Sequence, residues 1–253
     1  MRKCVVMKSF FIHVGEYCLL MSRVFRLPDK WRMFFRQLSK ELEKQGIQSL
    51  PIVIIISVFI GAILTIQTKL NTSNPLLPTY STGLVTRDTL LLEFSSTILC
   101  LILAGKVGSN IASEIGTMRI TEQIDALEIM DVNSANYLIL PKVTAFVLMM
   151  PILVIISMAV GLVGGYCVGM FSDVITVADY LLGIQYAFIP FYVWYSIIKS
   201  LVFAFIIASV SSYYGYYAYG GALEVGKAST SAVVNSSVLI LFFNLLLTNL
   251  MLN

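Results

Sequence analysis

The sequence predicts an all-α integral membrane protein, and its composition and its hydropathy pattern are the observations that predict this fold class. Of its 253 residues, 58% are hydrophobic and only 12% are charged, and the mean hydropathy is +0.85. A water-soluble domain usually carries about 25% charged residues. Five apolar runs follow one another along the chain, each near the roughly 20 residues that a helix needs to cross a bilayer.

The first 50 residues are expected to form a cytoplasmic segment of helices that lie in the membrane interface. Residues 1–50 hold ten of the seventeen basic residues. Between residues 31 and 44, apolar side chains recur at helical spacing and basic side chains occupy the opposite face. The apolar positions are Trp31, Phe34, Phe35, Leu38 and Leu42, and the basic positions are Arg32, Arg36, Lys40 and Lys44. This pattern is typical of an amphipathic helix at a membrane surface.

Residues 51–253 are expected to form one membrane domain with five spans. The third span is too long to cross a bilayer upright, so it is expected to tilt or to project beyond the hydrocarbon. Two outer loops, at about 70–88 and 172–185, are too short to be catalytic domains. We place the spans at about 51–68, 89–107, 143–171, 186–210 and 232–252.

The distribution of basic residues predicts the orientation of the chain in the membrane. Ten basic residues in 1–50, three in 106–142 and Lys227 would lie on one side, against Lys69 and Arg87 on the other. Because cytoplasmic loops carry an excess of Lys and Arg, the N-terminus is expected in the cytoplasm and the C-terminus on the far side.

The polar stretch between the second and third spans is expected to hold a cytoplasmic helix over about 112–130. Ile120, Ile124 and Leu127 fall on one face of this helix, at i, i+4 and i+7. Its acidic side chains share a different face: Glu122, Asp125 and Glu128. A helix with an acidic side between two spans suits docking to another protein, although a solvated connector would show the same pattern.

Small residues at intervals of four predict close helix packing in two of the spans. Gly161, Gly165 and Gly169 lie in the third span, and Ala104 and Gly108 repeat the spacing at the end of the second. Small residues let helix backbones approach each other where lipid offers no hydrophobic driving force. The alternative is a smooth surface along which lipid moves.

Two ionisable residues are expected inside the membrane, Glu93 near the outer end of the second span and Lys199 midway along the fourth. A charge at the bilayer centre costs at least about 2.5 kcal/mol and normally marks a pathway or a partner. The two can pair, or both can face a cavity that receives a lipid headgroup. Straight helices would place Lys199 several turns deeper than Glu93, and Lys199 alone can instead reach an interface by snorkelling.

Other features exclude several classes of function. Four cysteines show no C-x-x-C pair, and His13 is the only histidine, so neither a disulfide framework, a metal site nor a Ser-His-Asp hydrolase is indicated. The chain has no GxxxxGK[ST] phosphate-binding loop, so any ATP hydrolysis must occur on another subunit.

The motif AGKVGSNIASEIGTMRITEQIDALEIM, residues 104–130, resembles the signature of the MlaE (YrbE) permease family, the membrane subunits of MCE-associated lipid ABC transporters. The stretch KSLVFAFIIASVSSYYGYYAYGGALEVGKASTSAVV is similar to the family's pattern from the fourth span into the fifth, and Lys199 falls where the family has a lysine. Residues 122–141 are also similar to the cytoplasmic coupling loop of ABC importer permeases. Where the family has Arg-Glu-Leu-Gly-Pro, this chain has LEFSS at 92–96.

The resemblance implies a function and a set of partners. The chain would be the non-catalytic permease subunit of a phospholipid transporter in a bacterial inner membrane, with a periplasmic C-terminus, moving lipid between inner and outer membranes. Its partners would be a second copy, cytoplasmic ABC ATPase subunits that hold the ATP and Mg, a periplasmic MCE-domain lipid carrier and phospholipid; no cofactor or nucleic acid is expected on this chain. The expected lipid-cavity residues are Glu93 and Lys199. The expected ATPase-coupling residues are Glu114, Met118, Arg119, Glu122, Gln123, Asp125, Leu127 and Glu128.

Two alternative functions belong to other classes. A stand-alone ion-coupled carrier would use Glu93 and Lys199 as its relay, and the acidic cytoplasmic helix would then have no role. A membrane enzyme would need a nucleophile, a base or metal ligands clustered near one membrane face. Replacing Glu122 and Asp125 by lysine separates the transporter from the carrier, because only the transporter needs the acidic helix.

Overall fold

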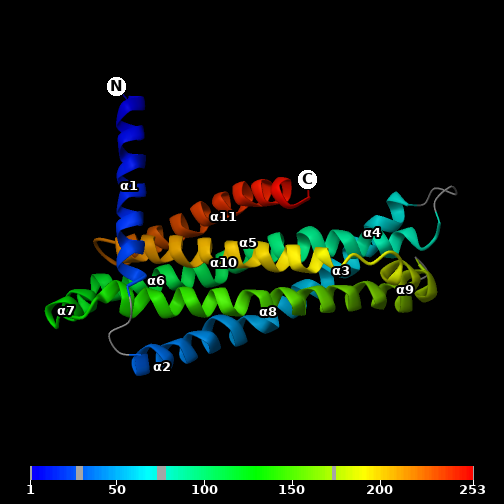
Figure 1. Ribbon diagram of the computed structural model, residues 1–253, viewed down its shortest axis with the longest axis horizontal. Coiled ribbons are helices and arrows are strands. Elements are labelled where there is room, and N and C mark those ends of the chain that lie inside the picture. The colour runs from blue at the N-terminus through cyan, green and yellow to red at the C-terminus, as the bar shows by residue number, and fades with distance from the viewer. Residues whose placement is uncertain (1, 27–30, 73–77, 173–174, 253) are drawn as a thin grey trace. The chain divides into compact units, whose positions relative to one another are not determined.

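The structure is a computed structural model that describes residues 2–26, 31–72, 78–172 and 175–252, with side chains described from residue 12 onward. These residues form helices and no strand (Figure 1). Five helical stretches are long and apolar enough to cross a membrane: Trp31–Asn71, Ser81–Ile120, Ser134–Phe171, Phe191–Tyr216 and Ala222–Leu252. The predicted class, an all-α membrane protein, is therefore confirmed.

The first of these stretches joins an amphipathic helix to an apolar one without a break. It consists of α2 (Trp31–Glu41), the π segment η1 (Leu42–Gly46), the 3₁₀ segment η2 (Ile47–Ser49) and α3 (Leu50–Asn71). Pro51 lies in the first turn of α3, where its missing N–H costs no helical hydrogen bond. Before it, α1 (Arg2–Val24) forms a separate helix.

The second stretch alternates α and π geometry. In order it contains α4 (Ser81–Thr89), η3 (Leu90–Ile98), α5 (Leu99–Leu103), η4 (Ala104–Gly108) and α6 (Ser109–Ile120). A π turn takes about one residue more than an α turn, and such turns are frequent at functional sites. A short helix, α7 (Gln123–Ile129), follows α6.

The remaining helices are long and mostly apolar. Helix α8 (Ser134–Phe171) has 38 residues, so at about 1.5 Å per residue it is about 57 Å long, well beyond a hydrocarbon core of about 30 Å. The short α9 (Val177–Gln185) precedes α10 (Phe191–Tyr216) and α11 (Ala222–Leu252).

Contacts divide the chain into two compact units. Unit 1 contains the chain up to Glu43 together with Ala104–Phe146 and Phe205–Leu239. Unit 2 contains Lys44–Leu103, Val147–Ala204 and the chain from Ile240 onward.

Within unit 2, glycines bring the backbones of α3 and α8 into direct contact. A Cβ on Gly61 would lie 1.9 Å from the carbonyl oxygen of Gly161, and one on Gly164 would lie 2.2 Å from that of Val58. A Cβ on Gly165 would overlap the hydroxyl of Tyr180, whereas one on Gly169 would make ordinary contacts. The closest approaches of the two backbones therefore involve Gly161 and Gly164. The spacing of four had singled out Gly161 but not Gly164.

Within unit 1, η4 and α6 pack closely against α10. Ala104 is fully buried, and a Cβ on Gly108 would lie 2.8 Å from the Ser211 hydroxyl. On the other helix, a Cβ on Gly215 would lie 2.7 Å from the carbonyl oxygen of Ala112. Small residues on both helices thus permit this approach.

Candidate functional site

The polar stretch predicted as one helix over about 112–130 forms two helices that meet at a corner. Helix α6 ends at Ile120 and α7 begins at Gln123. Between them, Glu122 adopts a left-handed conformation with φ of 60°, which costs roughly 1–2 kcal/mol for a residue with a Cβ. The turn allows Ile124 to become fully buried, and this burial offsets the backbone cost.

An ion pair spans the corner. Arg119 Nη1 lies 2.5 Å from Asp125 Oδ1, so the end of α6 is joined to the start of α7. The Arg119 guanidinium also lies 5.9 Å from the centre of the Tyr216 ring. These contacts tie the corner to α10 within unit 1.

The far end of α7 is joined to α8 and α10. Glu128 accepts hydrogen bonds from the hydroxyls of Ser134 and Tyr216, each at 2.9 Å. Glu114 on α6 makes an ion pair of 2.9 Å with Lys142 on α8. Three of the acidic residues predicted to face a partner, Glu114, Asp125 and Glu128, are therefore also bonded within the chain.

The outward surface of the corner combines acidic and large apolar side chains. Glu122 and Gln123 are exposed, while Met118 and Leu127 are half-buried. Ile129 is 87% exposed and Met130 is 64% exposed. Neither residue was predicted to have a role. The sequence did contain a signal for this surface. Ile129 and Met130 are consecutive large apolar residues that fall outside the buried apolar stripe of this acidic helix. Exposed apolar side chains beside charged ones are typical of a protein contact surface.

A cavity of about 590 Å³ opens beside the same segment in unit 1. It lies between α2, the turn that follows α7, and the start of α8. Asp131 in that turn is left-handed, with φ of 57°, so both ends of α7 are left-handed turns. The lining residues are Met33, Phe34, Gln37, Leu127, Met130, Asp131, Val132, Asn133, Asn136 and Tyr137.

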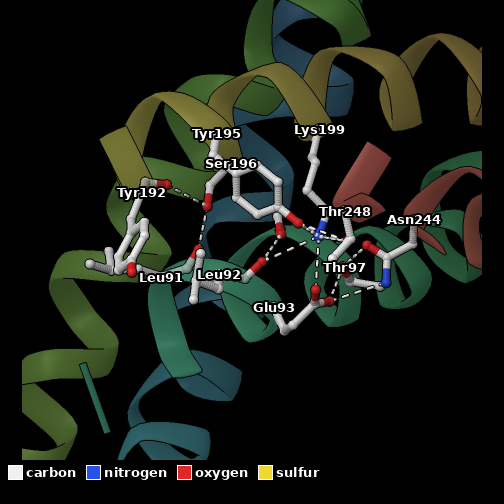
Figure 2. A network of polar contacts seen from close by, with 11 residues as sticks. Leu91, Leu92, Glu93, Thr97, Tyr192, Tyr195, Ser196, Lys199, Asn244 and Thr248 are labelled. Atoms are coloured by element: carbon white, nitrogen blue, oxygen red, sulfur yellow. Dashed lines mark hydrogen bonds and ion pairs between the residues drawn. The ribbon is translucent and has the colours of Figure 1, made fainter. Parts of the chain in front are cut away.

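In unit 2, the two intramembrane ionisable residues form an ion pair. Lys199 Nζ lies 3.0 Å from Glu93 Oε1, as Figure 2 shows. Lys199 was expected several turns deeper than Glu93 because both helices were taken to be straight α-helices. Glu93 instead lies in the π segment η3. The long side chain of Lys199 spans the remaining distance.

The pair is surrounded by polar partners from three helices (Figure 2). Lys199 Nζ also donates to the Tyr195 hydroxyl at 2.9 Å and to the Leu92 carbonyl at 3.3 Å. The other carboxylate oxygen of Glu93 accepts from the Thr97 hydroxyl at 2.9 Å and from Asn244 Nδ2 at 3.1 Å. An ammonium has three protons to donate, so its bonds to Glu93, Tyr195 and Leu92 account for all of them.

The sequence contained an overlooked signal for these partners. The polar residues come in pairs four apart, so each pair shares one helix face. The pairs are Glu93 and Thr97, Tyr195 and Lys199, and Asn244 and Thr248. The Thr248 hydroxyl contacts that of Tyr195 at 2.8 Å and completes the cluster.

The two members of the ion pair between Lys199 and Glu93 differ in their exposure. The Lys199 side chain is fully buried, whereas the Glu93 side chain is 39% exposed. A headgroup can therefore touch Glu93 directly but can reach Lys199 only by displacing one of its present partners. Among the described residues, no group of three or more His, Cys, Asp or Glu side chains is arranged to hold a metal ion.

A third charged residue of unit 2, Arg87 on α4, was counted as an outer-loop charge but is buried. Its Nη1 donates to the carbonyls of Ile184 and Tyr186 at 2.8 and 2.7 Å, and its Nη2 pairs with Asp88 at 2.7 Å. Arg87 thus satisfies the carbonyls at the C-terminus of α9, where Ala187 turns the chain with φ of 46°. Its position fixes α4 against α9.

Comparison with known proteins identifies the family of the chain. The family model described as Permease MlaE matches residues 38–250. A probable ABC transporter permease protein of Rickettsia bellii is 41% identical over 218 residues, which cover 86% of this chain and 84% of the relative.

Two further relatives carry more specific names. The intermembrane phospholipid transport system permease protein MlaE of Haemophilus influenzae is 30% identical over 244 residues, 96% of this chain and 93% of the relative. The chloroplastic protein TRIGALACTOSYLDIACYLGLYCEROL 1 of Arabidopsis thaliana is 33% identical over 217 residues, 83% of this chain and 59% of the relative. The match to the family model covers most of the chain and confirms the resemblance carried by residues 104–130: the chain belongs to the MlaE permease family.

Proposed function

We propose that the chain is the non-catalytic membrane subunit of an ATP-driven transporter that moves phospholipid between inner and outer membranes. Family membership and the name of the Haemophilus relative support the transporter class and the lipid cargo. The observation that carries the proposal is the corner formed by α6 and α7, which holds an exposed acidic and apolar surface on a braced support.

The corner is suited to receive force from an ATPase. Glu122, Gln123, Ile129 and Met130 are exposed and available to a partner. Behind them, the contacts of Arg119 with Asp125 and of Glu128 with Tyr216 brace α7 against α6 and α10. A push on α7 is therefore passed to the longer helices of unit 1 instead of being lost in a flexible loop.

The partners proposed are cytoplasmic ABC ATPase subunits, a second copy of this chain and a periplasmic MCE-domain carrier. The corner would lie on the cytoplasmic side, with the C-terminus periplasmic. An exposed apolar face along α11 supports contact with a second copy or with lipid. This face includes Val234, Val238, Phe242 and Leu245.

We place the lipid-facing site at Glu93, with Lys199 behind it. The exposed carboxylate can meet a headgroup, while the buried ammonium holds the carboxylate in place. Thr97 and Asn244 orient its other oxygen. Lys199 is in this proposal a support for Glu93, and direct contact between Lys199 and lipid would require its bonds to rearrange.

Native mass spectrometry of the complex purified from its own host tests the proposal. The wild-type chain should appear as a dimer with an ATPase pair and retained phospholipid. Ile129→Asp should lose the ATPase, because it places a charge in the proposed apolar contact. The control is Leu182→Asp in α9, which is also exposed but belongs to unit 2. A wild-type chain that transports lipid without any ATPase would instead support the ion-coupled carrier.

A further inference from the structure

Lys142, which pairs with Glu114 beside the corner, is a buried cation that joins three helices of unit 1. Its side chain, on α8, is 3% exposed. Its Nζ lies 2.5 Å from Glu41 Oε1, on the last residue of α2, and 2.9 Å from Glu114 Oε2 on α6. A single ammonium therefore connects the amphipathic helix to the helix that carries the corner.

The ammonium of Lys142 contacts more than one carboxylate. Two carboxylates share one ammonium, and both carboxylate side chains are mostly buried. Carboxylates held near each other repel, and the repulsion is stronger where water is excluded. Lys142 is bonded to both Glu41 and Glu114 and offsets this repulsion.

The helices joined by Lys142 connect the corner to the amphipathic helix α2. Glu114 is on α6, whose end is fixed to α7 by the pair between Arg119 and Asp125. Glu41 is at the end of α2, which continues through η1 and η2 into the membrane helix α3 without a break. The path from α7 to α3 therefore consists of helices and ion pairs.

We propose that Lys142 is a positioning residue that ties α6 to α2, so that a displacement of the corner is transmitted to the amphipathic helix. The inference rests on the proposed function only for the source of the displacement, an ATPase bound at α7. In each cycle the ammonium keeps hold of both Glu41 and Glu114, and α2 follows α6.

The test measures the number of lipids moved per ATP hydrolysed. The complex, purified with its ATPase, is placed in proteoliposomes with NBD-labelled phosphatidylethanolamine. Lys142→Ala and Glu41→Gln should leave ATP hydrolysis in place but lower lipid moved per ATP by about tenfold, a typical size for coupling between sites. Lys142→Arg should restore most of the ratio, because a guanidinium can bind two carboxylates. The matched control is Glu43→Gln, an exposed position two residues after Glu41, which should behave as wild type.

A second variant separates coupling from folding. The triple variant Lys142→Met, Glu41→Gln, Glu114→Gln leaves no unpaired buried charge, so it should fold even if Lys142→Ala does not. It should hydrolyse ATP and remain uncoupled. A triple variant that moves as many lipids per ATP as wild type would overturn the inference and leave Lys142 with a packing role alone. A wild-type complex that hydrolyses ATP without moving lipid would instead overturn the proposed function, and the inference with it.

Discussion

Lys199 in unit 2 and Lys142 in unit 1 are both buried, but their surroundings differ in charge. Lys199 faces one carboxylate and three neutral oxygens, those of Tyr195, Leu92 and Thr248. Lys142 faces two carboxylates, from Glu41 and Glu114. Lys199 is therefore bonded to one carboxylate, and Lys142 is bonded to two.

The difference indicates two mechanical roles. In the Lys199 cluster every ammonium proton has an acceptor, which favours a single arrangement. Such an arrangement suits a fixed site behind a lipid-facing carboxylate. One cation bonded to carboxylates on two other helices ties three helices together, which suits the transmission of a displacement between them. Substitutions that remove each cation should therefore have unequal effects.

The largest loss of stability is expected for Lys142→Ala. It leaves two like charges close together in a mostly buried place, so unfolding should become easier by about 3–5 kcal/mol, the usual cost of breaking a buried ion pair. Unfolding of the purified chain in detergent, followed by tryptophan fluorescence, measures the change. Lys142→Arg is the control and should lose much less. If Lys142→Ala cost less than Lys199→Ala, the contrast between the two clusters would be unfounded.

A smaller loss is expected for Lys199→Ala, even though Lys199 is the more buried of the two. The Glu93 carboxylate left behind is 39% exposed and keeps its bonds to Thr97 and Asn244. The cost should therefore be about 2–3 kcal/mol, as for a hydrogen bond to a charged group. Adding Glu93→Gln to Lys199→Met should recover part of it in the same unfolding measurement. A double variant no more stable than Lys199→Ala would show that the pair is not what stabilises this site.

Arg87→Ala should cost about 2 kcal/mol, because it leaves the carbonyls of Ile184 and Tyr186 and the Asp88 carboxylate without the guanidinium that binds them. Its loss should also expose α9 to protease before the rest of the chain unfolds. Limited proteolysis followed by mass spectrometry detects such local opening. Arg87→Lys keeps the charge but loses the forked geometry, so an intermediate rate of cleavage is expected, and a rate equal to wild type would argue against the carbonyl contacts.

The smallest effect is expected at an exposed cluster, where charge matters least. Thr176 caps α9 by accepting from the Asp179 N–H at 3.3 Å, and Thr176→Ala should cost about 1 kcal/mol. Hydrogen bonds from Thr176 and then Thr79 hold the pKa of Asp179 below its ordinary value of 3.8. The stabilisation from Asp179 is therefore complete above about pH 4 and is lost as the pH falls through the lowered pKa. Proteolysis of α9 with pepsin should show this acid sensitivity in wild type and not in Asp179→Asn.

The fold class and the family could be predicted because they depend on features visible along the chain. Few charges, long apolar runs and residues 104–130 were sufficient. The break at Glu122 could not be predicted, because no Gly or Pro marks it. It depends on the burial of Ile124 and on the pair between Arg119 and Asp125, which are tertiary effects.

The candidate sites could be predicted in part. Glu93 and Lys199 stood out because charges are rare in apolar runs, but their relative depth could not be predicted, because the helical stretches that carry them begin at Ser81 and Phe191 and not near 89 and 186. Arg87 was misread because the polar residues around it resemble a loop. Lys142 was counted only as a cytoplasmic charge, since its two partners lie 28 and 101 positions away and no local pattern links them.

ATP-driven phospholipid transfer by the purified complex in proteoliposomes tests the proposed function most directly. Donor vesicles carry the wild-type complex and NBD-labelled phosphatidylethanolamine, and acceptor vesicles carry the periplasmic lipid carrier. Transfer should require ATP, and Ile129→Asp should abolish it, whereas Leu182→Asp should not. Transfer that continues without ATP, or that survives Ile129→Asp unchanged, would contradict a permease driven through the corner of α6 and α7.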